Sequence, residues 1–257
     1  FGSVAKYIAT SAIEASLDLK SMCKSSTKIF VLEVMGRHSG WIASSAELAN
    51  TSSSETYVHK ILLPEVRFNE DKFIEGVESD VSKFGYSVIV ASEGLKDNGG
   101  TLYSETGEKD SFGHSQLGGV APKIAKLINK NLGFKYHWSV SDYLQRSARH
   151  LASKTDIEQA VAVGKHAVKF ALAGKTGVMP IIKRISNDPY RWEIGEGNLS
   201  EIANKEKIVP DDYISIDGNR INGKGIQYLL PLIQGESFPE FYNGIPKYQQ
   251  LDLHFSD

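Results

Sequence analysis

The chain has 257 residues, of which 41% are hydrophobic and 23% charged, a composition typical of a folded globular protein and not of a disordered or fibrous one. Its 29 basic and 31 acidic residues give a formal net charge of -2, which excludes a global attraction to nucleic acid or to an anionic membrane. Cys23 is the one cysteine and cannot pair within the chain, and no apolar run approaches the ~20 residues of a membrane span. We therefore expect a cytoplasmic protein without nucleic-acid or membrane partners.

The chain opens with a helical pattern that is followed by a buried strand. Small or apolar residues recur at helical spacing as far as Leu19, which predicts a first amphipathic helix. Residues 29–34 form a short apolar run rich in branched side chains, which is typical of a strand buried on both faces of a parallel sheet. A helix is expected over residues 39–48, with Ser39 as its N-cap.

The same alternation continues beyond this first strand-loop-helix unit. Residues 57–63 and 86–92 predict two further strands. The helix expected between them has its inner face at Phe73, Val77, Val81 and Phe84. Strands that alternate with helices predict an α/β fold with a mainly parallel sheet and right-handed crossovers. Ligands of such sheets bind beyond the carboxyl ends of the strands, so the residues that follow each strand are the first candidates for a site.

A long loop and two helices are predicted in the second half of the chain. Residues 96–113 are dense in Gly, Asp, Ser and Thr, which indicates a surface loop. A helix resumes near Pro122, a residue suited to the first turn of a helix. A later helix is predicted to begin with a capping box at Thr155 and Glu158 and to end at Gly174.

Two strand ends carry polar residues suited to an anionic ligand. Gly36 lets the backbone approach a ligand closely, and Arg37 offers a planar fork of donors for a phosphate. A tight turn with a solvated arginine would show the same pattern. Glu93 follows another predicted strand, where it could accept hydrogen bonds from substrate hydroxyls or serve in an ordinary turn.

A third group of donors and several weaker patterns occur further along the chain. Tyr143 and Arg146 could hold a phosphate or form a polar helix face. The segment Gly174-Lys175-Thr176 resembles the end of a phosphate-binding loop, but it ends a helix instead of opening one, so we reject that interpretation. The seven histidines lack metal-ligand spacing and no nucleophile elbow is complete, so zinc and hydrolase functions are not supported.

The segment FVLEVMGRHSG at residues 30–40 resembles the most characteristic sugar-phosphate motif of the phosphofructokinases. Further matches follow in the family's order at residues 63–65, 92–94, 112–119, 144–146 and 156–179. The resemblance covers residues 1–194 and extends more weakly to Tyr248. It implies an α/β, Rossmann-like phosphofructokinase fold with helices on both faces of a mainly parallel sheet, of which this chain holds a part.

The resemblance implies that seven residues bind the sugar phosphate: Met35, Gly36, Arg37, Glu93, Tyr143, Arg146 and Lys28. Arg37 would also act catalytically, by stabilising the phosphoryl group in transfer, and Glu93 would bind sugar hydroxyls. Tyr143 and Arg146 would hold the 6-phosphate, and Lys28 would reach it from a neighbouring subunit. The resemblance therefore implies a homodimer or homotetramer with a shared sugar-phosphate site.

Some features of the family pattern are altered or missing. His137 stands where many relatives have a second cross-subunit arginine, and Ser147-Ala148 replaces the usual pair of glycines. The family's donor-binding motif and the motif that carries its catalytic aspartate would both precede Phe1. We therefore expect the chain to lack the donor-binding part, the catalytic aspartate and any metal ligand, although the family uses Mg²⁺ with its phosphoryl donor.

The reaction implied by the resemblance is phosphoryl transfer to the 1-hydroxyl of fructose 6-phosphate, giving fructose 1,6-bisphosphate. Trp41, Tyr143 in place of histidine, and the pair His137-Trp138 are most similar to bacterial pyrophosphate-dependent members, which favours pyrophosphate as the donor. An ATP-dependent 6-phosphofructokinase remains an alternative. A non-catalytic sugar-phosphate-binding regulatory subunit of the same fold is the alternative from another class.

The resemblance also divides the chain into three parts. Residues 1–145 are expected to form the fructose 6-phosphate-binding α/β domain. Residues 146–183 are expected to cross back to a donor domain that precedes this chain, and residues 184–257 to return onto the sugar-binding domain.

Overall fold

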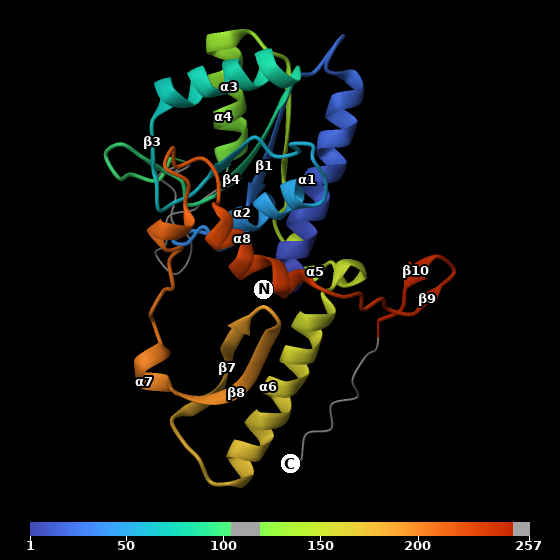
Figure 1. Ribbon diagram of the computed structural model, residues 1–257, viewed down its shortest axis with the longest axis vertical. Coiled ribbons are helices and arrows are strands. Elements are labelled where there is room, and N and C mark those ends of the chain that lie inside the picture. Colours follow the sequence, from blue (N-terminus) through green and yellow to red (C-terminus); the bar gives the residue numbers. More distant parts are fainter. Residues whose placement is uncertain (104–118, 249–257) are drawn as a thin grey trace, which may run out of the picture.

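The computed structural model describes residues 1–103 and 119–248, which form an upper α/β part and a lower part with one long helix and a hairpin (Figure 1). Most of the predicted loop at residues 96–113 lies outside the described residues, as do the motif matches at residues 112–118. Among the described residues, no helix is both long enough and apolar enough to cross a membrane.

A four-stranded parallel sheet in the order β2-β4-β1-β6 forms the centre of the upper part. Its strands are β1 (Ile29–Val34), β2 (Lys60–Leu62), β4 (Ser87–Ser92) and β6 (Tyr136–Val140). The register pairs Val34 with Ser92 and Glu33 with Val140, so β4, β1 and β6 end at one edge of the sheet. A separate short parallel pair is formed by β3 (Arg67–Phe68) and β5 (Lys96–Asp97). The predicted parallel sheet is confirmed.

Helices cover both faces of this sheet because the side chains of the central strand alternate between two apolar cores. The covering helices are α1 (Gly2–Met22), α3 (Glu70–Phe84) and α4 (Val120–Leu132). Leu32 and Val34 of β1 pack with residues of α1, whereas Ile29 and Val31 pack with residues of α3 and α4 on the opposite face. This arrangement confirms the predicted fold class, and α1 runs about one turn beyond the predicted end at Leu19.

The segment after β1 differs from its prediction. The expected helix is a short α2 (Trp41–Ser44) followed by a 3-10 helix, η1 (Ser45–Thr51), and its N-cap is Gly40 instead of Ser39. The Ser39 hydroxyl donates to the carbonyl oxygen of Lys207 at 2.9 Å, so a distant segment occupies the predicted cap.

The strand predicted at residues 57–63 is shorter, since β2 covers only its second half. The N–H groups of Tyr57 and Val58 donate to the side-chain oxygen of Asn50, at 2.8 and 3.0 Å, instead of joining the sheet. The prediction near Pro122 is confirmed, because this residue lies in the first turn of α4.

The long helix of the lower part, α6 (Lys154–Leu172), begins one residue before the predicted capping box. Its N-cap is Ser153, whose hydroxyl accepts a hydrogen bond from the N–H of Asp156 at 3.3 Å. The predicted cap at Thr155 is wrong because the Thr155 hydroxyl donates to the carbonyl oxygen of Gln234 at 3.3 Å. The predicted end is confirmed by Gly174, which follows the helix with a φ of 69°.

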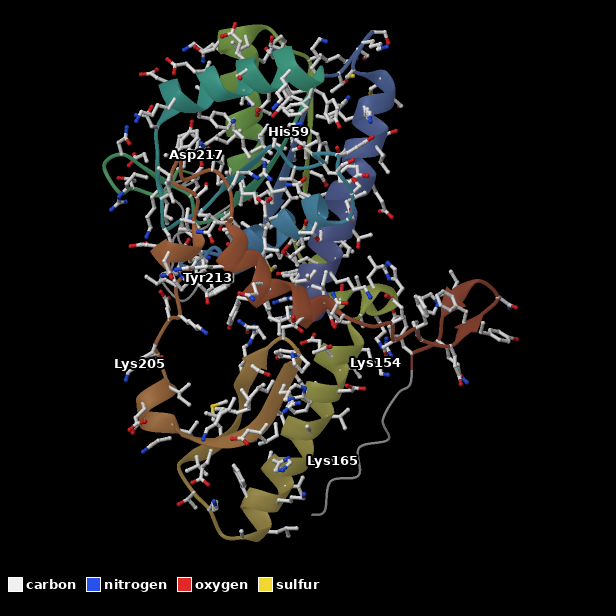
Figure 2. All side chains as sticks on the ribbon, in the orientation of Figure 1. His59, Lys154, Lys165, Lys205, Tyr213 and Asp217 are labelled. Atoms are coloured by element: carbon white, nitrogen blue, oxygen red, sulfur yellow. The ribbon has the colours of Figure 1, made fainter. Side chains whose placement is uncertain are left out.

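The lower part and the C-terminal return complete the described chain. The remaining elements are α5 (Leu144–Ser147), η2 (Arg149–Leu151), β7 (Val178–Asn187), β8 (Tyr190–Asn198), α7 (Leu199–Ile202), η3 (Asp211–Tyr213), α8 (Gly223–Leu229), η4 (Leu230–Ile233), β9 (Phe241–Tyr242) and β10 (Ile245–Pro246). β7 and β8 form an antiparallel hairpin. The segment from Lys205 to Tyr213 leads back from the lower to the upper part (Figure 2). The division at residues 145 and 183 stays a prediction.

Candidate active site

The carboxyl ends of β4, β1 and β6 bring most of the predicted site residues to one edge of the sheet. Met35, Gly36 and Arg37 follow β1, Glu93 follows β4, and Tyr143 and Arg146 follow β6. Because the three strands are parallel neighbours in register, the segments that leave them are also neighbours. Residues separated by more than 100 positions in the sequence thereby come to share one site.

Gly36 and Glu93 are joined directly. The N–H of Gly36 donates to Oε1 of Glu93 at 3.1 Å, and the Ser92 hydroxyl donates to the carbonyl oxygen of Gly36 at 2.7 Å. Gly36 has a φ of 145°, and a methyl carbon at this position would stand 2.6 Å from the carbonyl oxygen of Ser39. Only glycine fits this turn without strain, which explains why the backbone can come so close to Glu93.

The turn that carries the half-buried Arg37 is braced by the C-terminal return. The N–H of Gly40 donates to both carboxylate oxygens of Glu65, at 2.9 and 3.2 Å. The same carboxylate accepts from the N–H of Val209 at 2.9 Å. The indole N–H of Trp41 also donates to the backbone of this returning segment. The position of Arg37 is therefore fixed by contacts on both sides of its turn.

The short helix α5 is connected to the end of β1 by one buried side chain. Gln145 accepts a hydrogen bond from the N–H of Met35 at 3.3 Å and donates to the carbonyl oxygen of Asp142 at 2.8 Å. Tyr143 and Arg146 of the same segment are exposed, and the Arg146 guanidinium lies 4.5 Å from the centre of the Tyr143 ring. An exposed guanidinium stacked on an aromatic ring can still donate hydrogen bonds along its edge to a phosphate.

A cavity of about 190 Å³ opens between these segments and is lined by Glu33, Val34, Met35, Glu93, Gly119, Val140 and Asp142. Glu33 is almost fully buried, and its Oε2 accepts from the N–H of Ala121 at the start of α4 at 2.8 Å. Burial raises the pKa of the Glu33 carboxyl, and the negative charge of Glu93 acts in the same direction. Carboxylates that line a small polar cavity are suited to accepting hydrogen bonds from hydroxyl groups.

Glu33, Asp142 and Gln145 were not among the predicted site residues. The sequence could have indicated Glu33, because a single acidic residue in an otherwise apolar buried strand requires a hydrogen-bond partner. Gln145 lies within the motif match at residues 144–146, but its contacts depend on the tertiary fold, and the sequence gives no signal for Asp142.

Lys28 is the predicted site residue that the structure does not bring to the others. It precedes β1, whereas Met35 follows this strand, so the two lie roughly 20 Å apart along the strand axis. The Lys28 amine donates to the carbonyl oxygen of Cys23 at 2.9 Å. Its predicted contact across a subunit boundary stays a prediction.

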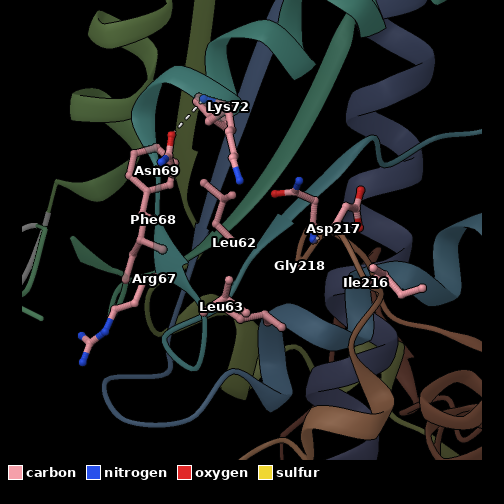
Figure 3. Close-up of a pocket in the computed structure, with 13 residues that line it drawn as sticks. Leu62, Leu63, Arg67, Phe68, Asn69, Lys72, Ile216, Asp217 and Gly218 are labelled. Atoms are coloured by element: carbon pink, nitrogen blue, oxygen red, sulfur yellow. Dashed lines mark hydrogen bonds between the residues drawn. The ribbon is translucent and has the colours of Figure 1, made fainter. Parts of the chain in front are cut away.

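A second cavity, of about 250 Å³, lies at the β2 side of the sheet (Figure 3). It is bounded by the start of α3, which carries Asn69 and Lys72, and by the loop of Asp217 and Gly218. None of the seven predicted residues lines this cavity. Within residues 1–103 and 119–248, no cluster of three or more His, Cys, Asp or Glu side chains could hold a metal ion.

The chain matches a family model described as "Phosphofructokinase" over residues 8–171. It is 54% identical over 254 residues to "Pyrophosphate--fructose 6-phosphate 1-phosphotransferase" of Halomonas elongata, a match that covers 99% of this chain and 60% of that protein. The protein of the same name from Methylococcus capsulatus is 53% identical, with coverage of 98% and 60%. The chain thus spans about three fifths of the length of these relatives.

The fold is also similar to a solved structure, that of a pyrophosphate-dependent phosphofructokinase from Nitrosospira multiformis. The TM-score is 0.87 at 50% sequence identity, and the match covers 98% of this chain and 59% of that one.

Proposed function

The chain belongs to the phosphofructokinase family, and on this basis we propose that the whole protein transfers a phosphoryl group from pyrophosphate to the 1-hydroxyl of fructose 6-phosphate. The observation that carries the proposal is the meeting of the Gly36–Arg37 turn, Glu93 and the Tyr143–Arg146 segment at one edge of the sheet. Two relatives above 50% identity are named for this reaction, which supports pyrophosphate as the donor. The product is fructose 1,6-bisphosphate, formed in the cytoplasm.

The proposed roles follow from the place of each side chain. Glu93 accepts hydrogen bonds from hydroxyls of the sugar, next to the backbone of Met35 and Gly36. Arg37, on the braced turn, stabilises the phosphoryl group as it moves, since such transfers depend mostly on positioning and on charge stabilisation. Arg146 binds the 6-phosphate together with Tyr143. The proton of the 1-hydroxyl is accepted by an aspartate that this chain does not contain.

Magnesium fits this part of the protein poorly. Two of the three carboxylates that line the cavity are already engaged by backbone N–H groups, Glu33 by Ala121 and Glu93 by Gly36. We therefore propose that Mg²⁺ would accompany pyrophosphate and offset its negative charge, and that the described residues do not coordinate it.

The lower part of the molecule supports the proposed boundary at residue 145, whereas the boundary at residue 183 falls inside β7. In the 19-residue helix α6, Gln159 is the only fully buried residue, and Val161, Val168 and Leu172 are exposed. A helix with so little burial is not stable by itself in water, because tertiary packing supplies most of the stability of a helix. We propose that residues 146–183 pack against a donor domain and that residues 184–257 return onto the sugar-binding domain, residues 1–145.

The exposed outer strand of the sheet, β6, supports the proposal of an oligomer. Within the described chain β6 is an edge strand, and its Trp138 and Val140 are 46% and 40% exposed. An exposed edge with large apolar side chains is normally covered, because it otherwise promotes aggregation. We propose that a second subunit covers it in a homodimer or homotetramer, and that His137 and Lys28 contribute to the sugar-phosphate site of this neighbour.

The proposed function is tested by incubating the whole protein with fructose 6-phosphate, Mg²⁺ and either pyrophosphate or ATP. We expect fructose 1,6-bisphosphate with pyrophosphate and little or none with ATP. Turnover with ATP alone would establish the ATP-dependent alternative. Binding of fructose 6-phosphate without turnover with either donor would establish the regulatory alternative.

A further inference from the structure

Gln145 is a buried polar residue at the centre of the site. It is only 2% exposed, and buried amides are almost always hydrogen-bonded. Its two bonds run in opposite directions, from Oε1 to the N–H of Met35 and from Nε2 to the carbonyl oxygen of Asp142. One side chain therefore links the end of β1 to the turn between β6 and α5.

This turn has an uncommon conformation that needs support from its surroundings. Asp142 has a φ of 38°, which non-glycine residues seldom adopt. The N–H of Leu144 closes the turn by donating to the carbonyl oxygen of Ser141 at 3.0 Å, and the N–H of Ser141 donates to that of Glu33 at 3.0 Å. These backbone bonds shape the turn, and the Gln145 side chain ties α5 to the N–H of Met35, the residue that follows β1.

We propose that Gln145 is a positioning residue that holds the Tyr143–Arg146 segment at a fixed place relative to Met35 and Arg37. This inference rests on the proposed function, in which one end of the site binds the 6-phosphate and the other receives the 1-hydroxyl. Binding energy from a distant group of a substrate can serve to orient its reacting atom, but only if the two ends of the site are rigidly connected. Gln145 supplies this connection.

Two substitutions of Gln145 distinguish the contributions of its two hydrogen bonds, one with Met35 and one with Asp142. Gln145→Met has a similar volume and removes both hydrogen bonds, whereas Gln145→Glu keeps an acceptor for the Met35 N–H and loses the donor to Asp142. The matched control is Gln159→Met, because Gln159 is also a buried glutamine, 5% exposed, whose amide donates to the Tyr190 hydroxyl at 2.8 Å. None of these three variants removes a group that touches the sugar phosphate.

The test is a double-mutant cycle with Arg146→Ala in the whole protein, measured as kcat/KM for fructose 6-phosphate. We expect Gln145→Met to lower kcat/KM roughly 10- to 100-fold in the unaltered background, because misplacement by about 1 Å has effects of this size. In the Arg146→Ala background it should lower kcat/KM less than about threefold, since the phosphate contact is already lost. Gln145→Glu should show the same dependence on Arg146, although its carboxylate would face the carbonyl oxygen of Asp142. KM for pyrophosphate should stay unchanged, and Gln159→Met should change neither background.

Equal effects of Gln145→Met in the two backgrounds would overturn the inference, as would a lowered melting temperature with unchanged kcat/KM. If Gln145→Met does not fold, Gln145→Glu decides by the same comparison. Absence of turnover in the unaltered protein would refute the proposed function itself. Normal turnover with equal effects in both backgrounds would refute this inference alone.

Discussion

Gly94 lies directly against the carbonyl oxygen of Arg37. A methyl carbon on Gly94 would collide with this oxygen and would stand 2.5 Å from the carbonyl oxygen of Gly36. Gly94 follows Glu93 at the end of β4, so two strand ends of the site are in contact through their backbones. The shape of the Arg37 turn therefore depends on a residue that belongs to another strand.

Gly94→Ala is expected to displace this turn. Overpacking of this kind costs about 1–3 kcal/mol of unfolding free energy, and the shift of Arg37 should lower kcat in addition. Denaturant unfolding and steady-state kinetics of the whole protein measure the two effects. Gly223→Ala is the control, since a methyl carbon on Gly223 meets nothing within 4 Å. A Gly94→Ala variant with normal kcat would show that the turn does not position Arg37.

Glu65 should hold the returning segment against the Arg37 turn. Glu65→Leu removes the carboxylate that accepts from Gly40 and Val209, so both N–H groups lose their acceptor. We expect trypsin to cleave after Lys205 and Lys207 about tenfold faster in this variant, equivalent to a loss of about 1.4 kcal/mol. The control is Asp212→Asn, which removes only the exposed ion pair with Lys224. Unchanged cleavage in Glu65→Leu would mean that other contacts hold the segment.

The buried ion pair of Lys60 and Asp80 should be sensitive to the loss of either partner. The amine and carboxylate are 3.1 Å apart, with side-chain exposures of 9% and 16%. Burial raises the pKa of Asp80 even though Lys60 acts in the opposite direction, which shows that removing the carboxylate from water is costly. We expect Lys60→Met to lower the unfolding free energy by about 3–5 kcal/mol, because Asp80 remains buried without its partner.

The double variant Lys60→Met, Asp80→Leu should recover much of this loss, since no buried charge remains. The exposed pair of Lys224 and Asp212 is the control, and breaking it should cost about 0–1 kcal/mol. A similar loss for both pairs in denaturant unfolding would refute the assigned importance of burial.

His59 should make the stability of the upper part dependent on pH (Figure 2). Its ring is buried between Phe84 and Tyr86, and its Nδ1 accepts from the N–H of Val88 at 3.1 Å. Burial lowers the pKa of His59 to about 4, and the positive charge of Arg220 acts in the same direction. Because the unfolded histidine has a pKa of about 6.5, the unfolded state binds more protons between pH 6.5 and pH 4.

The unfolding free energy should therefore fall as the pH is lowered through this window, by up to about 1.4 kcal/mol per pH unit from this group. His59→Gln should flatten the dependence, whereas His150→Gln, at an exposed position, should leave it unchanged. Urea unfolding at pH values between 4 and 7 measures the slopes. Equal slopes with and without His59 would contradict the assignment.

The sequence predicted those features that depend on local pattern. The apolar runs at β1 and β4 identified the buried strands, and the polar residues after them identified Arg37 and Glu93 as site candidates. The parallel pairing of β1 with β4 places both at the same end of the sheet. The parallel arrangement made this possible, because it brings together the ends of strands that are distant in the sequence.

The remaining features depend on contacts between distant segments, which a local pattern does not contain. Ser39 and Thr155 are suitable caps by residue type, but Lys207 and Gln234 occupy their hydroxyls. Gln145 lies in a motif match at residues 144–146, but its two hydrogen-bond partners are set by the tertiary fold.

We propose that the carboxyl ends of β1, β4 and β6 form a sugar-phosphate site with a reacting end at Arg37 and a phosphate-binding end at Arg146. Replacing the two arginines should therefore affect different kinetic constants. Arg146 would contact a phosphate that is bound alike before and during transfer, whereas Arg37 would contact charge that redistributes during transfer.

The most direct test is steady-state kinetics of Arg37→Ala and Arg146→Ala in the whole protein, with Arg191→Ala on the exposed face of β8 as the control. Arg146→Ala should raise KM for fructose 6-phosphate roughly 10- to 150-fold, equivalent to about 1.5–3 kcal/mol, with a much smaller change in kcat. Arg37→Ala should lower kcat about 10²- to 10³-fold at saturating sugar. Normal kcat with only a raised KM in Arg37→Ala would contradict the account.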